Sequence, residues 1–497
     1  MIKVLAKKEL LDQLSSPKFV FLFAVTTVLV VFSLYTGSSA YVGARSEFEA
    51  TQRLSRSELE NRGNYFEVAQ YGVKVARAPA PLSAVAGGVS SALGRSARVR
   101  PETQPELSPA PLADTPVLAV LGELDFNVVA RVFLSLFVLI LTYNAVAGEK
   151  EAGTLKAVLA NPVPRTQLLL GKALGLFGTL LAAVVVPSLL GLLVMKVGFG
   201  IALGAGEWAR LLATGAAAVL YLLAVFAVGI LVSTLTARSS VAFLVLLLVW
   251  VAFVEVIPKA SPMLASQLRP APSFAALQSE RDRIQADYQQ GLFRSMSQAF
   301  SGLGATQVNT PEEAERRQAA IDSAMNRARD SLGQARDARL LRLEEEFRNR
   351  QDAMTRLSLT FARLSPAAAM SHAVEVFSGT DFDLHRRWRD DLTAYRRSLE
   401  GYLREKGVTF GGFRIAIRTE SSGGSSGGAR RSNSITFGGP TSEDARLDLS
   451  AFPVFAAGSE SFLSALGRAA PDLVIMGLWA AGALLLAFAR FLKYDVR

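Results

Sequence analysis

Long apolar runs alternate with polar segments along this chain, and six of these runs are long enough to cross a bilayer. A membrane-spanning helix needs about 20 mostly apolar residues. The pattern predicts transmembrane helices at residues 18–37, 128–147, 173–195, 211–235, 240–258 and 472–490. We therefore expect a mainly α-helical membrane protein with six transmembrane helices in the lipid bilayer.

The N-terminal segment has its own pattern. Residues 1–17 place leucines on one side of a helix and lysines on the other, which is typical of an amphipathic helix that lies in the membrane interface. Pro17 is expected to start the first span. A small-residue stretch near Ala40 also fits a signal-peptidase site, and cleavage there would remove that span.

Basic residues in the short connections predict the orientation of the spans. With a cytoplasmic N-terminus, the inner segments, including residues 148–172 and the tail 491–497, hold nearly all of these residues. The short connection near 197–210 holds Arg210, with Lys196 at its edge. Both termini are therefore expected in the cytoplasm, and residues 38–127 and 259–471 outside it.

The two outer segments differ in composition. Residues 38–127 begin with a polar helical stretch and turn proline-rich, which predicts an extended strap without a packed core. Residues 259–471 are long enough for one domain, mostly helical with a few strands, one of them in "VTFGGFRIAIR". An apolar stripe from Leu340 to Leu364 predicts either an antiparallel helical hairpin within this domain or a coiled coil with a second subunit. The Ser/Gly-rich stretch "SSGGSSGGARRSNS" is expected to be a flexible linker.

Composition narrows the function classes. Half of the 497 residues are hydrophobic, and the formal charge of +10 is accounted for by basic residues flanking the spans, so we expect no nucleic-acid partner. The chain has no cysteine, which excludes disulfides, thiolate metal sites and a cysteine nucleophile. The two histidines, His372 and His385, have no ligand pattern around them, and we interpret them as surface residues rather than a metal site.

Two features inside the predicted spans have alternative interpretations. Glu255 is the one acidic residue well inside a span, which makes it a candidate functional group, but Lys259 is near enough for a simple interfacial salt bridge. Gly171, Gly175 and Gly178 have the spacing of a helix-packing face, used either within the chain or between subunits.

The segment between the second and third spans carries the most specific pattern. In "YNAVAGEKEAGTLKAVLANPVPRTQLLLGK", Gly153 and Thr154 can open a short helix with Leu155 on its apolar face, and Pro162 ends it. A simple turn needs no helix of its own. A short helix between two breaks suits docking into a groove of another protein.

This segment resembles the cytoplasmic loop of ABC-2 transporter permeases, in the branch with large extracytoplasmic insertions. The matching positions are Glu149, Glu151, Gly153, Thr154, Pro162, Arg165, Gly171 and Lys172, and Lys156 departs from the family, which often has an acidic residue there. The resemblance implies the membrane subunit of an ATP-binding-cassette exporter in a bacterial inner membrane. It also implies a cytosolic ATPase partner, which binds ATP and Mg, and a second permease subunit, identical or not.

The resemblance further implies which residues couple the permease to the ATPase: Glu149, Glu151, Gly153, Thr154, Leu155, Pro162 and Arg165. The sequence contains no Gly-x-x-x-x-Gly-Lys-Ser/Thr phosphate loop, so we expect no ATP hydrolysis and no cofactor in this chain itself. Two alternatives stay open. One is a device of the same architecture that acts mechanically on an extracytoplasmic partner protein without transport. The other is a membrane receptor that signals through residues 148–172, for which the chain offers almost no cytosolic output domain.

Overall fold

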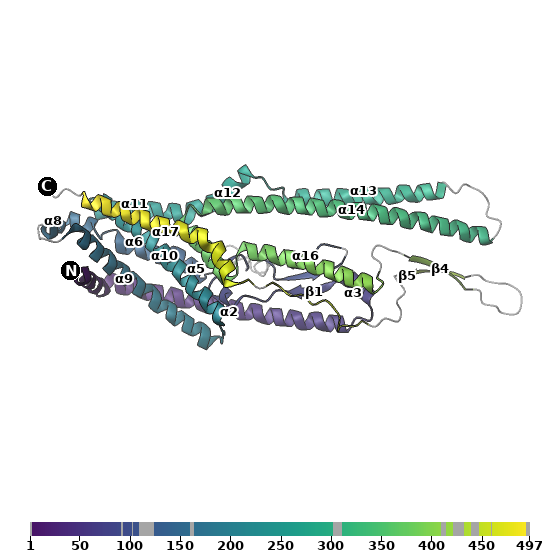
Figure 1. Ribbon diagram of the computed structural model, residues 1–497, viewed down its shortest axis with the longest axis horizontal. Helices are drawn as coiled ribbons and strands as arrows, with labels where there is room; N and C mark the ends of the chain where they lie inside the picture. The colour runs from purple at the N-terminus through teal and green to yellow at the C-terminus, as the bar shows by residue number, and fades with distance from the viewer. Residues whose placement is uncertain are drawn as a thin grey trace.

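A computed structural model describes most of the chain as an elongated, mainly helical molecule (Figure 1). The described residues are 2–90, 93–101, 103–108, 124–159, 164–301, 311–408, 414–420, 432–438, 447–458 and 460–493. A helical bundle forms one end, near which both termini lie, and a long helical hairpin and a smaller lobe extend from the other (Figure 1). We call the end with the termini proximal and the other end distal.

Six helical segments of the described chain are long and apolar enough to cross a membrane, as the sequence predicts. They are α2 (Pro17–Glu60), α5 to α7 (Phe126–Glu151), α9 with η5 (Arg165–Gly198), α10 (Ala205–Leu235), α11 with α12 (Ser239–Leu268) and α17 (Phe462–Leu492). Pro17 occupies the first turn of α2, where the Ser16 side chain accepts a hydrogen bond from the Phe19 amide. At about 66 Å, α2 is far longer than the hydrocarbon core and continues into the distal lobe.

Three of the six segments contain a π-helical stretch. The second segment consists of α5 (Phe126–Val128), the π-helical η4 (Val129–Leu134), α6 (Ser135–Thr142) and α7 (Ala147–Glu151). In the third, η5 (Val194–Gly198) follows α9 (Arg165–Leu193), which contains Pro187. In the fifth, η6 (Ala252–Val256) joins α11 (Ser239–Val251) to α12 (Ile257–Leu268). The π-helical stretches were not predicted, because apolar periodicity does not distinguish them from α-helix.

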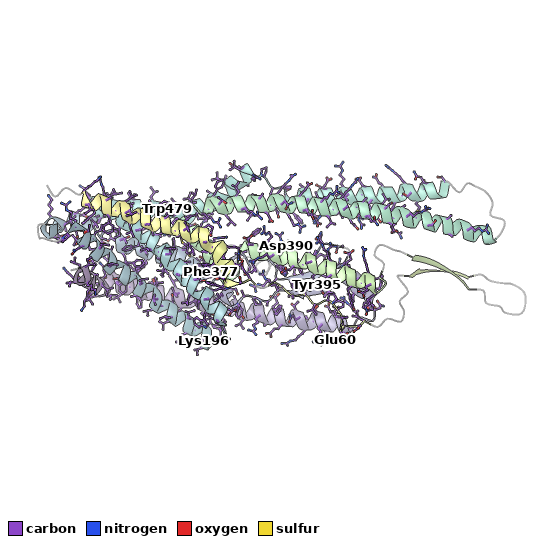
Figure 2. The ribbon with its side chains drawn as sticks, in the orientation of Figure 1. Glu60, Lys196, Phe377, Asp390, Tyr395 and Trp479 are labelled. Carbon is purple, nitrogen blue, oxygen red and sulfur yellow. The ribbon has the colours of Figure 1, made fainter. Side chains whose placement is uncertain are left out.

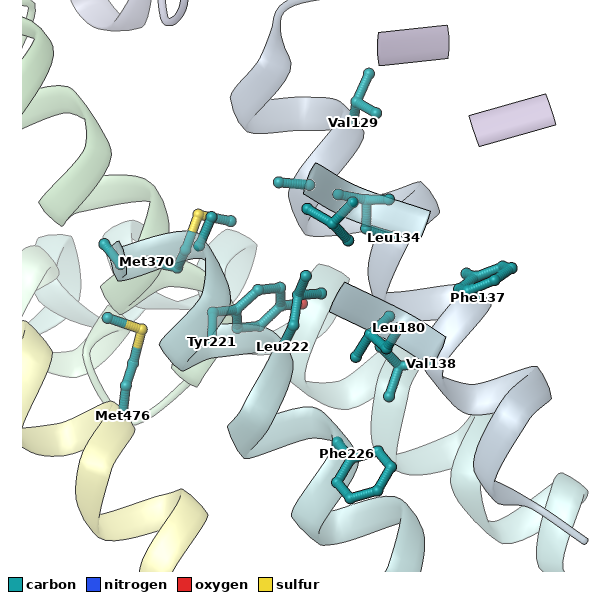
Figure 3. Close-up of a cluster of buried hydrophobic side chains, with 14 of the residues drawn as sticks. Val129, Leu134, Phe137, Val138, Leu180, Tyr221, Leu222, Phe226, Met370 and Met476 are labelled. Atoms are coloured by element: carbon teal, nitrogen blue, oxygen red, sulfur yellow. The ribbon is translucent and has the colours of Figure 1, made fainter. Parts of the chain in front are cut away.

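Buried aliphatic, aromatic and methionine side chains hold the bundle together (Figure 3). They come from η4, α6, α9, α10 and α17, and from α15 (Pro366–Ser378), which packs against α10 and α17. Tyr221 is fully buried at the centre, and its hydroxyl donates to the Arg131 carbonyl oxygen at 3.0 Å. Burying such side chains and satisfying this hydroxyl both stabilise the bundle.

The N-terminal helix α1 (Ile2–Leu14) packs on the glycine face of α9. A Cβ at Gly171 would lie 2.7 Å from the Leu5 Cβ, and a Cβ at Gly175 would lie 2.6 Å from the Glu9 Cβ. Glycine therefore allows the two helices to approach closely. Within the chain, this face is used for intramolecular packing, the first of the two interpretations above.

The distal lobe contains a small sheet where the sequence predicted only a strap. Strands β1 (Val73–Ala76), β2 (Ser96–Val99) and β3 (Glu106–Leu107) pair antiparallel in that order. Short 3-10 turns, η1 (Pro81–Ala84) and η2 (Gly88–Ser90), follow β1, and α3 (Tyr65–Tyr71) precedes it. Trp388 and Leu399 of α16 (Phe382–Glu405) pack on the buried valines of the sheet. The prediction of a strap without a core is therefore wrong, because α16, distant in sequence, supplies five of the thirteen buried side chains of this core.

A helical hairpin extends beside this lobe. Helix α13 (Phe274–Ser301) runs antiparallel to α14 (Pro311–Ala362), and Arg281 forms a 2.6 Å ion pair with Glu344 across it (Figure 1). The predicted antiparallel hairpin is thus present. Strands β4 (Arg414–Glu420) and β5 (Ser432–Gly438) pair antiparallel, and β4 overlaps the predicted strand at residues 414–418. Most of the predicted Ser/Gly-rich linker lies outside the described residues.

Both histidines differ from the prediction of surface residues. His385 is only 7% exposed and lies against the Trp388 ring. The Nδ1 atom of His372 lies 2.7 Å from a carboxylate oxygen of the fully buried Asp472. Among the described residues, no group of three or more side chains is arranged to hold a metal ion.

Candidate functional site

The loop between the second and third helical segments, residues 148–172, lies at the proximal end of the bundle (Figure 1). Helix α7 ends at Glu151, and α8 (Thr154–Leu159) follows after a sharp bend. Gly153 forms the bend with φ of +73°, a conformation that favours glycine, although no atom would obstruct a Cβ there. The predicted short helix is present and begins at Thr154, whereas Pro162 lies outside the described residues.

An ion-pair cluster ties this loop to α9 and α1. The Lys172 ammonium lies 2.8 Å from a carboxylate oxygen of Glu149 and 3.5 Å from one of Glu9. Only 13% of the Lys172 side chain is exposed, so solvent screens this cluster less than a surface pair. The cluster joins the start of the loop, the interfacial helix and the beginning of the third segment.

Ser233 of α10 holds the beginning of α7. Its Oγ accepts hydrogen bonds from the backbone amides of Val146 and Ala147, both at 3.0 Å, and donates to the Tyr143 carbonyl oxygen at 3.1 Å. The first amides of a helix have no partner within that helix, so Ser233 supplies one. Nearby, the Lys150 ammonium donates to the Thr236 carbonyl oxygen at 3.1 Å, just after α10 ends.

Charged side chains of the loop bond to the proximal ends of the two remaining helices, α11 and α17. The Glu151 carboxylate accepts from the amide of Ser239, the first residue of α11, at 2.9 Å. Arg165 donates to the carbonyl oxygen of Leu492, the last residue of α17, at 2.8 Å. Each contact places a charge against the helix end of opposite partial charge, which is the favourable sense.

In the described part of the loop, the outer surface of the bend makes none of these contacts. Leu155 of α8 is buried, with an exposed fraction of 1%. Ala152, Gly153, Thr154 and Lys156 are exposed. The loop therefore has an inner side bonded to the helix ends and an outer side that a partner can contact. We call the four exposed residues the loop tip.

Glu255, the other candidate, lies apart from this loop in η6. Its carboxylate lies 2.5 Å from the Lys259 ammonium, one helical turn away, and 36% of its side chain is exposed. This is the simple salt bridge that the sequence offered as an alternative to a functional role.

Sequence reasoning missed a polar joint between the bundle and the distal lobe. The Asp472 carboxylate of α17 accepts from the Arg363 guanidinium at 2.8 Å and contacts His372 of α15. The sequence signal was weak, because Asp472 stands at the very start of its predicted span.

A second cluster lies further out along the same joint. The Glu460 carboxylate accepts from Arg468 at 2.6 Å and from Arg387 at 3.0 Å, and Arg468 also pairs with the buried Asp381. Burial opposes ionisation of Glu460, but the two guanidinium groups outweigh it and lower its pKa to about 2. The two clusters fix α14, α15 and α16 to the distal end of α17.

Comparisons with known proteins identify the family. No curated protein matches this chain significantly. The family model of the ABC-2 family transporter proteins matches residues 3–496, which is nearly the whole sequence. A chain with six candidate membrane-spanning helices that matches this family over nearly its whole length is a multi-pass transporter membrane protein. The chain belongs to the ABC-2 transporter family.

Proposed function

We propose that this chain is the permease subunit of an ATP-binding-cassette exporter, and that a separate cytosolic ATPase drives it through the loop tip. The observation that carries the proposal is the connectivity of residues 148–172. Their inner side bonds to α1, α9, α10, α11 and α17, while the tip stays exposed. The ATPase holds ATP and Mg, and this chain contributes no catalytic group.

The contacts suggest how force crosses the loop. A partner that displaces α8 also displaces α7, because only Ala152 and Gly153 connect the two helices. The ion pairs of Lys172 and the hydrogen bond from Ser239 to Glu151 then carry the displacement to α9 and α11. Packed helices tend to move as rigid bodies, so a shift at the loop becomes a tilt of the segments.

The proposed arrangement places both termini and residues 148–172 in the cytoplasm of a bacterial cell, with the distal lobe and hairpin outside the inner membrane. It also includes a second permease subunit. Of the six candidate spans, Ser239–Leu268 is the least buried within the chain, with 17% of its apolar window covered. This face supports a contact with a second copy, although lipid also covers apolar helix faces.

Charge reversal at the loop tip tests the ATPase contact. This chain has a lysine where the family often has an acidic residue, so we expect its own ATPase partner to be complementary to Lys156. Within the described residues, exposed Lys156 has no bond to the bundle, so Lys156→Glu should insert normally and lose about tenfold in permease-stimulated ATP hydrolysis. The measurement is the ATPase rate of the two purified components in proteoliposomes. Lys196→Glu makes the same change at the distal end of the third segment (Figure 2) and should leave the rate unchanged.

Gly153→Pro is a second, backbone test of the same contact. Proline requires φ near −65° and cannot adopt the bend, so α8 should change direction and the coupling should fail. If both Lys156→Glu and Gly153→Pro kept full stimulation, the loop tip would not be the docking surface. The mechanical alternative has no observation of its own in its favour, since a long hairpin suits either role.

A further inference from the structure

A large polar cleft lies at the distal side of the molecule, between α14, α16 and the end of α12. Its volume is about 880 Å³, enough for a molecule much larger than a single inorganic ion. Asp390 of α16, which Figure 2 labels, is one of the residues that line the cleft. Five arginines line the cleft: Arg269, Arg348, Arg356, Arg386 and Arg389.

The arginines come from opposite walls. Arg348 and Arg356 lie two turns apart on α14, and Arg386 and Arg389 lie one turn apart on α16. Each pair therefore lies on one face of its helix. All four of these arginines line the space between the two helices, and Arg269 lines it from the end of α12.

Three carboxylates in the lining, those of Glu345, Asp352 and Asp390, neutralise this charge only in part. Asp383, just outside the lining, lies 3.6 Å from the Arg386 guanidinium. The ion pair between Arg389 and Asp352 is long, at 3.9 Å, and both side chains are largely buried. Among the described residues, the Nε atoms of Arg386 and Arg389 and one Asp352 oxygen are buried without a hydrogen-bond partner. These atoms are closed off from the cleft, so a ligand there meets the rest of each guanidinium group. Five arginines against three carboxylates leave the lining with an excess of positive charge, which favours an anionic ligand that supplies hydrogen-bond acceptors.

We propose that this cleft binds a phosphate-bearing ligand. A phosphate group directs its oxygens away from one another and can accept from arginines on both walls at once, whereas a carboxylate presents two oxygens in one plane. The volume accommodates a ligand that carries more than one phosphate or a phosphate with a larger attached group. A lipid headgroup and a soluble phosphate compound share this chemistry.

This site is separate from the proposed ATPase contact. The cleft lies at the distal side and the loop tip at the proximal end of the bundle (Figure 1). Ligand binding is measured on the purified permease chain alone, without ATPase or nucleotide. A failure to bind phosphate therefore leaves the coupling proposal intact, and the reverse also holds.

The experiment measures binding of inorganic tripolyphosphate to the full chain in detergent by calorimetry at low salt. A parallel arm measures retention of phosphatidylglycerol against phosphatidylcholine in mixed nanodiscs. We expect Arg386→Ala/Arg389→Ala to weaken phosphate binding at least about tenfold, and Arg386→Lys/Arg389→Lys to retain part of it. Arg53→Ala/Arg56→Ala removes the same charge from exposed α2 positions and should change affinity less than about twofold.

Thermal unfolding of each variant separates loss of the site from loss of the fold. Arg356→Ala provides a further check, because this exposed residue lines the cleft from α14 and its truncation should weaken binding without lowering stability. Arginine-dependent binding in either arm supports the proposal, and the arm that responds identifies a soluble or a lipid source. The proposal is overturned if neither phosphate probe binds, if the cleft variants bind like wild type, or if poly-glutamate binds equally well.

Discussion

Single polar residues decide how the proximal ends of the helices are joined, and Ser233 is the clearest example. It accepts two hydrogen bonds from amides that begin α7 and donates one to a carbonyl oxygen of the same segment. The local sequence gives no sign of this role, because Ser233 stands in an apolar run and its partners are 86 and 87 residues away. A small polar residue inside a predicted span is compatible with many partners.

Ser233→Ala should therefore destabilise the bundle. The substitution leaves two buried amides without an acceptor, and we expect a loss of about 2 kcal/mol. Thermal unfolding of the purified protein, followed by circular dichroism, measures the change. Ser39→Ala on the exposed side of α2 is the control and should be silent; equal unfolding temperatures for Ser233→Ala and wild type would contradict the assigned role.

For Gly153, unlike Ser233, the local sequence did predict the structural role. The sequence predicted a helix start at Gly153 and Thr154, and the structure begins α8 at Thr154 after the positive φ of Gly153. The partners of Glu151 and Arg165 were not predictable, because they are backbone groups at the ends of α11 and α17. A motif shows that a charge is present, but only the fold shows which helix end it meets.

At the scale of the elements, close packing of α1 on α9 depends on glycine. A Cβ at Gly175 would lie 2.6 Å from the Glu9 Cβ and 2.8 Å from the Ala6 carbonyl oxygen, and neither can move without shifting α1. Gly175→Ala should therefore cost about 1–3 kcal/mol and loosen α1.

Limited proteolysis within residues 1–17, together with thermal unfolding, measures this effect. Gly215→Ala in α10 is the matched control, since no atom lies within 4 Å of the added Cβ. Alanine is favoured over glycine in a helix, so this control should be neutral or slightly stabilising. Equal protease resistance of Gly175→Ala and wild type would show that α1 does not depend on this contact.

The stability of the polar joint around Asp472 should depend on pH. Burial opposes protonation of His372, but the hydrogen bond and the negative charge of Asp472 together outweigh burial and raise the pKa of His372. A raised histidine pKa contributes stability that is fully present below about pH 6.5 and is lost as pH rises through the folded-state value. Burial also raises the pKa of Glu375 from 4.5 to about 7. Its ionisation therefore also lowers stability as pH rises from 4.5 to about 7.

We therefore expect the unfolding temperature to fall as pH rises above about 6.5, and His372→Gln to flatten this slope. His385→Gln is the control. Burial lowers the pKa of His385 to about 4, so this ring stays neutral over the same range and its loss should keep the slope. A slope unchanged by His372→Gln would remove His372 from the account.

At the scale of the whole molecule, the sequence predicted the bundle far better than the distal part. Six apolar runs became six helical segments because span length depends on local composition alone. The distal lobe depends on contacts between residues distant in sequence, such as Trp388 of α16 on the valines of β1 and β2. Proline-rich composition predicted an extended chain, and the core that this chain completes could not be inferred without α16.

The most direct test of the account is the side of the membrane on which the loop tip lies. The chain has no cysteine, so Thr154→Cys creates a single exposed thiol. A membrane-impermeant maleimide should label it in inside-out vesicles and not in right-side-out vesicles, and should label Ser323→Cys on α14 with the opposite pattern. Labelling of Thr154→Cys in sealed right-side-out vesicles would contradict an ATPase contact at residues 148–172.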